Sequence, residues 1–483
     1  IINFTLAVNY AISGHNVWSY HLVNLIIHIL ATLTLFGIIR RTILISKINL
    51  NREESLLFSF ACALLWGLHP VQTQAVTYVI QRCESLMSLF FLLTVYSALR
   101  GWQAKSSNHW HLLAVMFFLL AVFSKEVAIV CPILLISYEW VFQSKNPLRS
   151  LKESPLLYSG IFLGCIITFI IVINGNTIVS RTNQTPFTPM DYWVTQCEVI
   201  FHYLRLALWP SGLVIDYGWP VAKARDIWPF IAGTLLLLFL SVWSLWQRKV
   251  TGFLGVWFFL ILAPTSLIPL NDLAFEHRMY LPLAAIIVLI VGIAFNIEKW
   301  AQKWFKTSNQ PKHSPSFLII LIICAGLILG FLTYQRNYDY RSEIAIWSDT
   351  ISKRPNNFRG YHGLGLALGK NGQLDDALQY LLHARMINPD DGYVNNDTGF
   401  ILFLMNKPDE SIPFFREAIR LRPNNSKMHN NMGAALAQTG MLKEGIRHFS
   451  EALRIKPDYV SARNNLIRAS AAYNQSLSEN HKN

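Results

Sequence analysis

Residues 56–96 read LLFSFACALLWGLHPVQTQAVTYVIQRCESLMSLFFLLTVY, a polar segment enclosed by two apolar ones. The apolar ends, 56–66 and 86–96, have the composition of helices that lie in a membrane. The segment 67–85 between them carries side chains that bind or titrate, namely His69, Gln72, Gln74, Gln81, Arg82 and Glu84. A bare connection between two membrane helices needs none of these groups, so the stretch predicts a helical membrane fold with a polar site at one membrane face.

The composition of the whole chain indicates a polytopic membrane protein. Of its 483 residues, 53% are hydrophobic and 14% are charged, and the mean hydropathy is +0.33. A soluble domain usually has about 25% charged residues. The chain also contains about ten apolar runs, at 22–39, 56–68, 85–99, 110–123, 127–143, 156–173, 227–246, 253–270, 278–297 and 316–334. Several of these runs are shorter than the ~20 residues of a straight membrane span. The runs therefore predict that membrane spans exist, but they do not predict where each span ends.

Lysine and arginine predict the orientation of these spans. With the residues before Leu22 placed outside, fifteen basic residues fall in inner loops and seven in outer loops, which fits the positive-inside rule. The inner set is Arg40, Arg41, Lys47, Arg52, Arg100, Lys105, Lys145, Arg149, Lys152, Arg248, Lys249, Lys299, Lys303, Lys306 and Lys312. The outer set is Arg82, Lys125, Arg181, Arg205, Lys223, Arg225 and Arg278. This count of basic residues assumes that the segment Asp191–Trp209 does not cross the membrane. The polar groups of this segment recur at helical spacing, which suits a helix that lies in the membrane interface.

Two other kinds of partner are excluded by the distribution of charged and sulfur-containing residues. The formal charge of +13 is spread over short loops, without the basic stripe and interleaved aromatics of a nucleic-acid-binding surface. The six cysteines show no metal-ligand spacing, and no glycine-rich phosphate loop or Ser/His/Asp set is evident. We therefore expect no nucleic acid, no metal and no cofactor.

A second architecture follows residue 334. Prolines recur every 34 residues, at Pro355, Pro389, Pro423 and Pro457. Small residues keep the same register, as at Gly365, Gly399 and Gly433, and this period is that of the tetratricopeptide repeat, a pair of antiparallel helices. The sequence thus predicts an all-α protein with a membrane domain at 1–334, an α-solenoid of three repeats plus capping helices at 335–475, and a polar tail at 476–483.

The chain resembles the transmembrane and tetratricopeptide-repeat O-mannosyltransferases, which belong to the GT-C class. The resemblance rests on LAVNYAISGHNVWSYHLVNLIIH (6–28), LHPVQTQAVTYVIQRCESL (68–86), SKE (124–126), DYGWP (216–220), EHRMYLPLA (276–284) and the repeats. It implies a polyprenyl-phosphate sugar as donor and a polypeptide as acceptor. It also implies that the catalytic acidic pair of the first outer loop lies upstream of Ile1, in a part that this sequence lacks.

A lipid-phosphate donor requires cations beside its phosphate and a carboxylate near the attacking hydroxyl. Arginine is favoured for phosphate because its fork binds two oxygens, so we predict Arg82 and Arg278, followed by Lys125, as phosphate ligands. Glu84 is the candidate catalytic carboxylate present in the chain, because a carboxylate at that depth is costly unless it is paired or functional. The other candidates for the site are His69, Gln72, Gln81, Glu126, Asp216, Glu276, Tyr280, His21 and Asn9.

Each of these residues also has a purely structural interpretation. The arginines could anchor the protein to headgroups, Lys125 could pair with Glu126, and Asp216 could form a turn. The leading hypothesis is inverting transfer of a sugar, mannose by the resemblance, from polyprenyl phosphate to protein Ser or Thr on the non-cytoplasmic side, with the repeats recruiting the acceptor. The compartment would be the periplasm, the extracellular space or the lumen of the endoplasmic reticulum. The alternative is a non-catalytic membrane scaffold whose repeats recruit extracytoplasmic partners.

Overall fold

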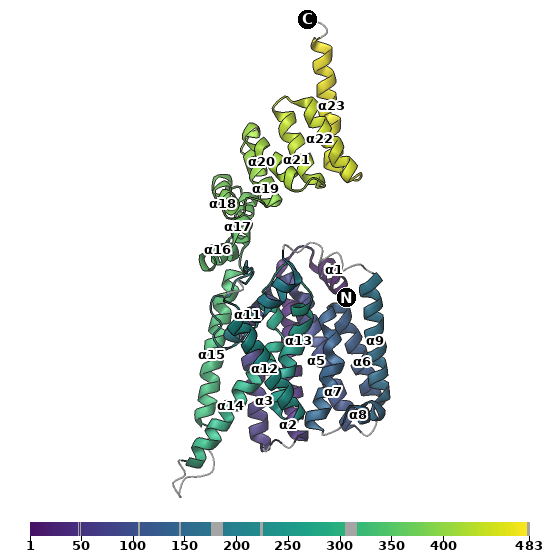
Figure 1. Cartoon of the computed structure of the whole chain (residues 1–483), viewed down its shortest axis with the longest axis vertical. Helices are drawn as coiled ribbons and strands as arrows, with labels where there is room; N and C mark the ends of the chain where they lie inside the picture. The colour runs from purple at the N-terminus through teal and green to yellow at the C-terminus, as the bar shows by residue number, and fades with distance from the viewer. Residues whose placement is uncertain are drawn as a thin grey trace. The chain divides into compact units, whose positions relative to one another are not determined.

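The structure is a computed structural model that describes residues 1–46, 48, 50–104, 107–143, 146–174, 187–222, 226–304 and 316–480. Within these ranges every regular element is a helix and no β-strand occurs (Figure 1). The chain divides into two compact units. The first unit comprises 1–213 and 219–340, and the second comprises 341–483 together with Val214–Gly218. The predicted all-α fold with a membrane part and a repeat part is confirmed.

The first unit contains the apolar helices. The longer ones are α1 (Ile2–Ser13), α2 (Val17–Ile45), α3 (Arg52–Gly67), α5 (Arg82–Gln103), α6 (Asn108–Ser124), α7 (Cys131–Phe142), α9 (Pro155–Asn174), α11 (Pro189–Leu208), α12 (Trp228–Trp246), α13 (Val250–Leu267), α14 (Pro282–Trp304) and α15 (Ser316–Asp339). The shorter ones are η1 (Pro70–Gln72), α4 (Thr73–Thr77), η2 (Val79–Gln81), η3 (Glu126–Val130), α8 (Pro147–Glu153) and η4 (Glu276–Met279). All ten predicted apolar runs coincide with helices of this unit.

Six described helices are long and apolar enough to cross a membrane, and a seventh span arises if α3 and the bent segment after it are counted together. The helices α6 and α9 are apolar but shorter. The amphipathic helix α11 carries Asp191, Glu198 and Arg205 and is not among the six. Of the basic residues used for orientation, Lys47, Lys105, Lys145, Arg181, Lys223, Arg225, Lys306 and Lys312 lie outside the described residues.

Small residues set how closely these helices pack. On α9, Gly160 and Gly164 are one turn apart and face α6. A Cβ atom at Gly160 would lie 2.6 Å from Val115, and one at Gly164 would lie 2.9 Å from Leu119. Membrane helices associate through such small-residue faces because lipid supplies no hydrophobic drive for packing. The sequence of α9 therefore fixes its contact with α6, beside which it stands in Figure 1.

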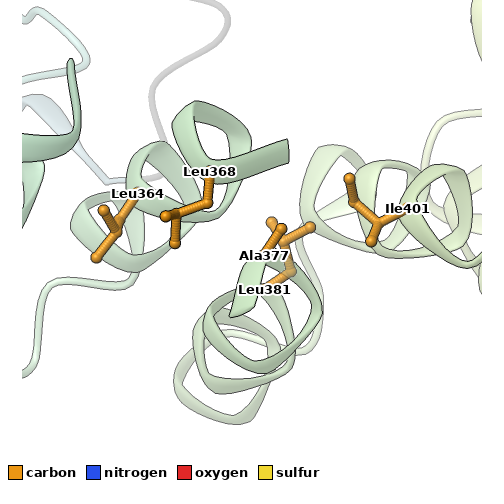
Figure 2. Close-up of a cluster of buried hydrophobic side chains, with 5 residues drawn as sticks. All are labelled: Leu364, Leu368, Ala377, Leu381 and Ile401. Carbon is orange, nitrogen blue, oxygen red and sulfur yellow. The ribbon is translucent and has the colours of Figure 1, made fainter. Parts of the chain in front are cut away.

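The second unit is the helical repeat array. Its helices are α16 (Glu343–Lys353), α17 (Phe358–Lys370), α18 (Leu374–Ile387), α19 (Gly392–Leu404), α20 (Pro408–Leu421), α21 (Ser426–Gln438), α22 (Leu442–Ile455) and α23 (Val460–Asn480). Each periodic proline lies two residues after α16, α18, α20 or α22, where it ends the second helix of a repeat. Figure 2 shows one shared core, in which α17, α18 and α19 contribute Leu364, Leu368, Ala377, Leu381 and Ile401.

The predicted boundaries can be compared with these elements. Residue 334 falls inside α15, whereas the two compact units meet at Tyr340 and Arg341. The residues assigned to a polar tail begin within α23, which continues to Asn480, and 481–483 lie outside the described residues.

Candidate active site

The polar segment after α3 folds into three short helices instead of a plain linker. Pro70 occupies the first position of η1, where its missing N–H is no loss. His69 caps η1, because its Nδ1 accepts a hydrogen bond from the Val71 amide at 3.3 Å. The segment Pro70–Thr77 turns by 51° from α3. The turn brings η1 and α4 against η4, a segment some two hundred residues later.

Tyr280 joins this segment to the membrane helices. Its carbonyl oxygen accepts hydrogen bonds from Trp66 Nε1 at 2.9 Å and from Gln72 Nε2 at 3.4 Å. Its hydroxyl lies 2.7 Å from His28 Nδ1, while His28 Nε2 lies 2.9 Å from the Gly67 carbonyl oxygen. Since a carbonyl oxygen can only accept, Nε2 carries the proton of a neutral imidazole and the Tyr280 hydroxyl donates to Nδ1. Two predicted candidates, Gln72 and Tyr280, are thus in contact.

Gln74 and His277 form a second link between the same segments. The Gln74 Oε1 atom accepts hydrogen bonds from the His277 backbone N–H at 2.9 Å and from its Nδ1 at 3.0 Å. Burial, together with the positive charges of Lys125 and Arg278, lowers the pKa of His277 well below its ordinary value. The imidazole is therefore neutral at pH 7, with its lone pair on Nε2.

Glu84 and Lys125 form a buried ion pair, in which Lys125 Nζ donates to Glu84 Oε2. The side chain of Glu84 is 4% exposed and that of Lys125 is 18% exposed. Burial alone would lower the pKa of Lys125, but Glu84, together with Cys83 and Glu126, outweighs burial and raises that pKa. Lys125 thus pairs with Glu84, on α5, while Glu126 is exposed. The geometry keeps the carboxyl group and the amine together in a largely water-free place.

Arg82 is completely buried and holds helix ends together. Its Nε donates to Asn24 Oδ1 at 2.6 Å, and its two Nη atoms donate to the carbonyl oxygens of Thr5 at 3.3 Å and Tyr20 at 3.2 Å. Among the described residues no carboxylate pairs with it. A guanidinium has five N–H groups, so two remain beyond these three bonds. Its predicted role as a phosphate ligand stays a prediction.

Arg278 is also buried, and it holds the loop that precedes η4. Its Nη1 donates to the Leu273 carbonyl oxygen at 3.0 Å and its Nη2 donates to that of Asp272 at 2.8 Å. The hydroxyl groups of Tyr192 and Tyr203 on α11 also interact with it. Phosphate binding by Arg278 likewise stays a prediction, with part of its donor capacity already used by the backbone.

The remaining candidates fall into two groups. In the first unit, His69 Nε2 lies 3.3 Å from the Ala207 carbonyl oxygen. Gln81 Oε1 accepts a hydrogen bond from Cys83 Sγ. Asn9 donates a hydrogen bond to Ser19 Oγ at 3.2 Å, and His21 on α2 is half-buried. Glu276 is fully buried, 4.0 Å from Arg336. In the second unit, Asp216 accepts a bond from Arg359 at 2.8 Å and one from the Gly218 amide. Its donor-site role remains a prediction.

Three residues of this polar network were absent from the predicted site: His28, His277 and Arg336. The sequence carried a signal for Arg336, since an arginine near the end of an apolar helix is costly without a partner. His28 makes buried contacts with the Tyr280 hydroxyl and the Gly67 carbonyl oxygen, which is a structural role. Within the described residues no group of three or more His, Cys, Asp or Glu side chains is arranged to hold a metal ion.

Comparisons with known proteins give two family matches. Residues 1–173 match the family described as dolichyl-phosphate-mannose-protein mannosyltransferase, and residues 358–391 and 396–425 match the tetratricopeptide repeat. The protein O-mannosyl-transferase TMTC3 of Homo sapiens is 25% identical over 80% of this chain and 44% of its own length. The protein O-mannosyl-transferase F38B6.6 of Caenorhabditis elegans is 23% identical over 80% of this chain and 53% of its own length.

The chain spans about half the length of the curated relatives it matches. Among solved structures, the tetratricopeptide-repeat protein YrrB is 20% identical, covering 30% of this chain and 75% of that chain, with a TM-score of 0.26. The apolar helices and the first family match together indicate an integral membrane protein. The resemblance that the sequence motifs suggested is therefore confirmed: this chain is similar to the protein O-mannosyl-transferases over most of its length and carries tetratricopeptide repeats.

Proposed function

We propose that the protein is a membrane mannosyltransferase that moves mannose from a polyprenyl-phosphate carrier to Ser or Thr side chains of proteins on the non-cytoplasmic side. The observation that carries the proposal is the buried Glu84–Lys125 pair next to the network of Gln72, His277 and Tyr280. The charge of Glu84 contributes to raising the pKa of Tyr280, and the charge of Lys125 contributes to lowering the pKa of His277. The ion pair therefore lies close to these two side chains. The names of the relatives and the first family match support the same reaction.

The reaction needs a base, a cation and a positioned donor. The acceptor hydroxyl oxygen forms a bond to the anomeric carbon, the bond from that carbon to the phosphate oxygen breaks, and the hydroxyl proton passes to a carboxylate. Glu84 is the candidate carboxylate in this chain, and Lys125 can offset charge on the departing phosphate. Arg82 and Arg278 are the further proposed phosphate ligands.

A row of polar side chains in the second unit supports the proposal that the repeats hold the acceptor. The first helices of successive repeats are joined by three bonds at the same spacing of 35 residues: His362 to Asp397 at 2.9 Å, Asn431 to Asn396 at 3.0 Å, and Asn465 to Asn430 at 3.0 Å. Side-chain amides can bond both the donors and the acceptors of a peptide backbone. A row of them suits an extended polypeptide of variable sequence.

Transfer can be tested in membranes that contain the protein, with radiolabelled polyprenyl-phosphate mannose and a Ser/Thr-rich peptide. Glu84→Gln should lower the transfer rate about 10²–10⁴-fold, the range that one acid–base group contributes. The matched control is Glu153→Gln, which removes an exposed carboxylate paired with Arg149 and should leave the rate unchanged. A wild-type protein without transfer, whose repeats still capture the peptide, would favour the scaffold alternative instead.

Recruitment is tested by the paired replacement Asn396→Ala with Asn430→Ala. If the amide row holds the acceptor, KM for the peptide should rise several-fold while KM for the donor stays constant. Equal KM values for the peptide in the wild type and the variant would contradict recruitment by this row. The side of the membrane is tested separately by protease digestion of sealed vesicles, because a luminal repeat unit should be cut only after the vesicles are opened.

A further inference from the structure

Besides the polar site, the first unit has a groove that combines arginines with exposed apolar side chains. The groove lies between α2 and α5 and has a volume of about 550 Å³. Its lining is formed by Leu30, Leu33, Thr34, Phe36, Gly37, Arg40, Arg41 and Leu44 of α2 and by Leu93 and Tyr96 of α5. Nothing in the proposed transfer reaction uses these residues.

The groove lies at the membrane face opposite the candidate active site. The helices α2 and α5 run side by side, joined at one end by the Arg82–Asn24 bond and at the other by the Arg41–Gln103 bond, at 2.6 Å and 2.9 Å. Along α2, Arg40 lies ~35 Å from Val17, at 1.5 Å per residue. This distance exceeds the ~30 Å of a bilayer's hydrocarbon core. The arginines therefore lie at headgroup depth, on the face predicted to be cytoplasmic.

Three positive charges gather there without a negative partner among the described residues. Arg41 lies 5.3 Å from the centre of the Tyr96 ring, and the Tyr96 hydroxyl interacts with both Arg41 and Arg100. Arg100 also lies 4.4 Å from the centre of the Trp110 ring. Arg40 makes no hydrogen bond or ion pair to any described side chain. The observed partners of these arginines are the Gln103 amide and aromatic rings. These partners position the guanidinium groups but do not neutralise their positive charge.

The apolar side of the groove continues from the arginines toward the membrane centre. Leu30 and Leu33, about three and two turns before Arg40, are 46% and 59% exposed. Gly37 lets Tyr96 of α5 pack closely on α2, since a Cβ atom there would lie 2.9 Å from the Tyr96 ring. The basic end of the groove is thus continuous with exposed apolar side chains of α2.

We propose that this groove binds an anionic phospholipid of the cytoplasmic leaflet, with its phosphate on Arg40 and Arg41 and one acyl chain along Leu30 and Leu33. Basic pockets between membrane helices on this side are suited to anionic headgroups, and the forked guanidinium matches a phosphodiester. A zwitterionic lipid would leave the arginine charges uncompensated. The proposal does not depend on the transfer reaction.

The test compares purified full-length protein in phosphatidylcholine nanodiscs with protein in nanodiscs of phosphatidylcholine and phosphatidylglycerol in equal amounts. Native mass spectrometry measures the phosphatidylglycerol retained, and thermal unfolding measures the stabilisation. Arg40→Gln with Arg41→Gln should lower the affinity for phosphatidylglycerol about tenfold or more, given ~1 kcal/mol for each basic residue. Arg52→Gln, an exposed arginine on the same predicted face, should retain the lipid as the wild type does.

Leu33→Trp places a larger side chain on the apolar side of the groove without changing charge and should also reduce retention. If the Gln variant misfolds, Arg40→Lys with Arg41→Lys serves in its place, with weaker but measurable retention expected. Equal retention of phosphatidylglycerol by the wild type and the Gln variant would overturn the proposal. So would an equal loss in Arg52→Gln, which would indicate a general charge effect, or full displacement of the lipid by inorganic phosphate.

Discussion

The Tyr280 hydroxyl donates a hydrogen bond of 2.7 Å to His28 Nδ1, across 252 residues of sequence. Both side chains are buried. The Nε2–H group of His28 donates a second hydrogen bond, to the Gly67 carbonyl oxygen at 2.9 Å. This bond therefore ties α2, α3 and the η4 loop into one network. It couples the polar segment after α3 to the helices that position it.

The variant Tyr280→Phe removes the hydroxyl group that donates to His28. The buried Nδ1 atom of His28 is then left without a hydrogen-bond donor. We expect a loss of about 1–3 kcal/mol in unfolding free energy, the penalty for an unsatisfied buried polar group. Thermal unfolding in detergent provides the measurement. The matched control is Tyr334→Phe, because Tyr334 is 71% exposed and its hydroxyl should not matter. Equal melting temperatures for Tyr280→Phe and the wild type would contradict the network.

Lys125→Met leaves the Glu84 carboxylate buried without its partner. Breaking a buried ion pair from one side typically destabilises a protein by about 3–5 kcal/mol, so this variant should unfold at a markedly lower temperature. Adding Glu84→Gln should restore much of the stability, because the buried charge is then gone. A double variant as unstable as Lys125→Met would show that the amine matters for packing rather than for charge. The comparison uses the same thermal unfolding measurement on all three proteins.

His277 predicts a dependence of stability on pH. Its pKa is lowered in the folded protein by burial and by Lys125 and Arg278, so the unfolded chain binds a proton below about pH 6.5 that the folded protein does not. Stability should therefore be complete above pH 6.5 and fall by up to about 1.4 kcal/mol per pH unit below it, until the lowered pKa is reached. His277→Gln should flatten this fall.

The measurement is thermal unfolding between pH 7.5 and pH 5.5, reported as the difference between variant and wild type. His109→Gln is the matched control, because His109 is exposed and should follow the wild-type curve. Parallel curves for His277→Gln and the wild type would mean that His277 is not held neutral.

Gly433 in α21 predicts a packing effect in the repeats. A Cβ atom at this position would lie 2.8 Å from the Phe449 ring and 3.0 Å from the Gly445 carbonyl oxygen. Alanine favours a helix over glycine by about 1 kcal/mol, but overpacking costs about 1–3 kcal/mol. Since Phe449 is 1% exposed and enclosed, we expect the clash to prevail and Gly433→Ala to destabilise the unit.

Hydrogen exchange in α21 and α22 measures this effect locally. Exchange should become faster in both helices of Gly433→Ala and stay unchanged in Ser450→Ala, which alters a side chain on the exposed side of α22. Slower exchange in Gly433→Ala would mean that helix propensity prevails over the contact.

Much of the fold followed from local patterns. The periodic prolines predicted where the second helix of each repeat ends, because proline cannot continue a helix, and Pro389 and Pro423 lie just beyond α18 and α20. The apolar runs predicted helices because apolar segments of this length satisfy their backbone groups internally in lipid. These features depend on neighbours in sequence, which is why the sequence was sufficient.

The polar site was predicted only in part. The sequence placed Gln72 and Tyr280 in segments expected at the same membrane face, and the structure brings them into contact. The structure pairs Lys125 with Glu84 of α5, a contact that the sequence did not predict. A side chain's partner depends on the packing of helices, and sequence adjacency does not decide it.

The sequence by itself determined the kinds of elements, their order and the segments that carry polar groups, because periodicity and hydropathy act within one helix. The tertiary structure alone decided that Arg82 binds the carbonyl oxygens of Thr5 and Tyr20. It also alone decided that Asp216 packs with Arg359 in the second unit. Such choices depend on which distant groups meet when helices pack, since a buried donor takes the acceptors that the fold brings within reach.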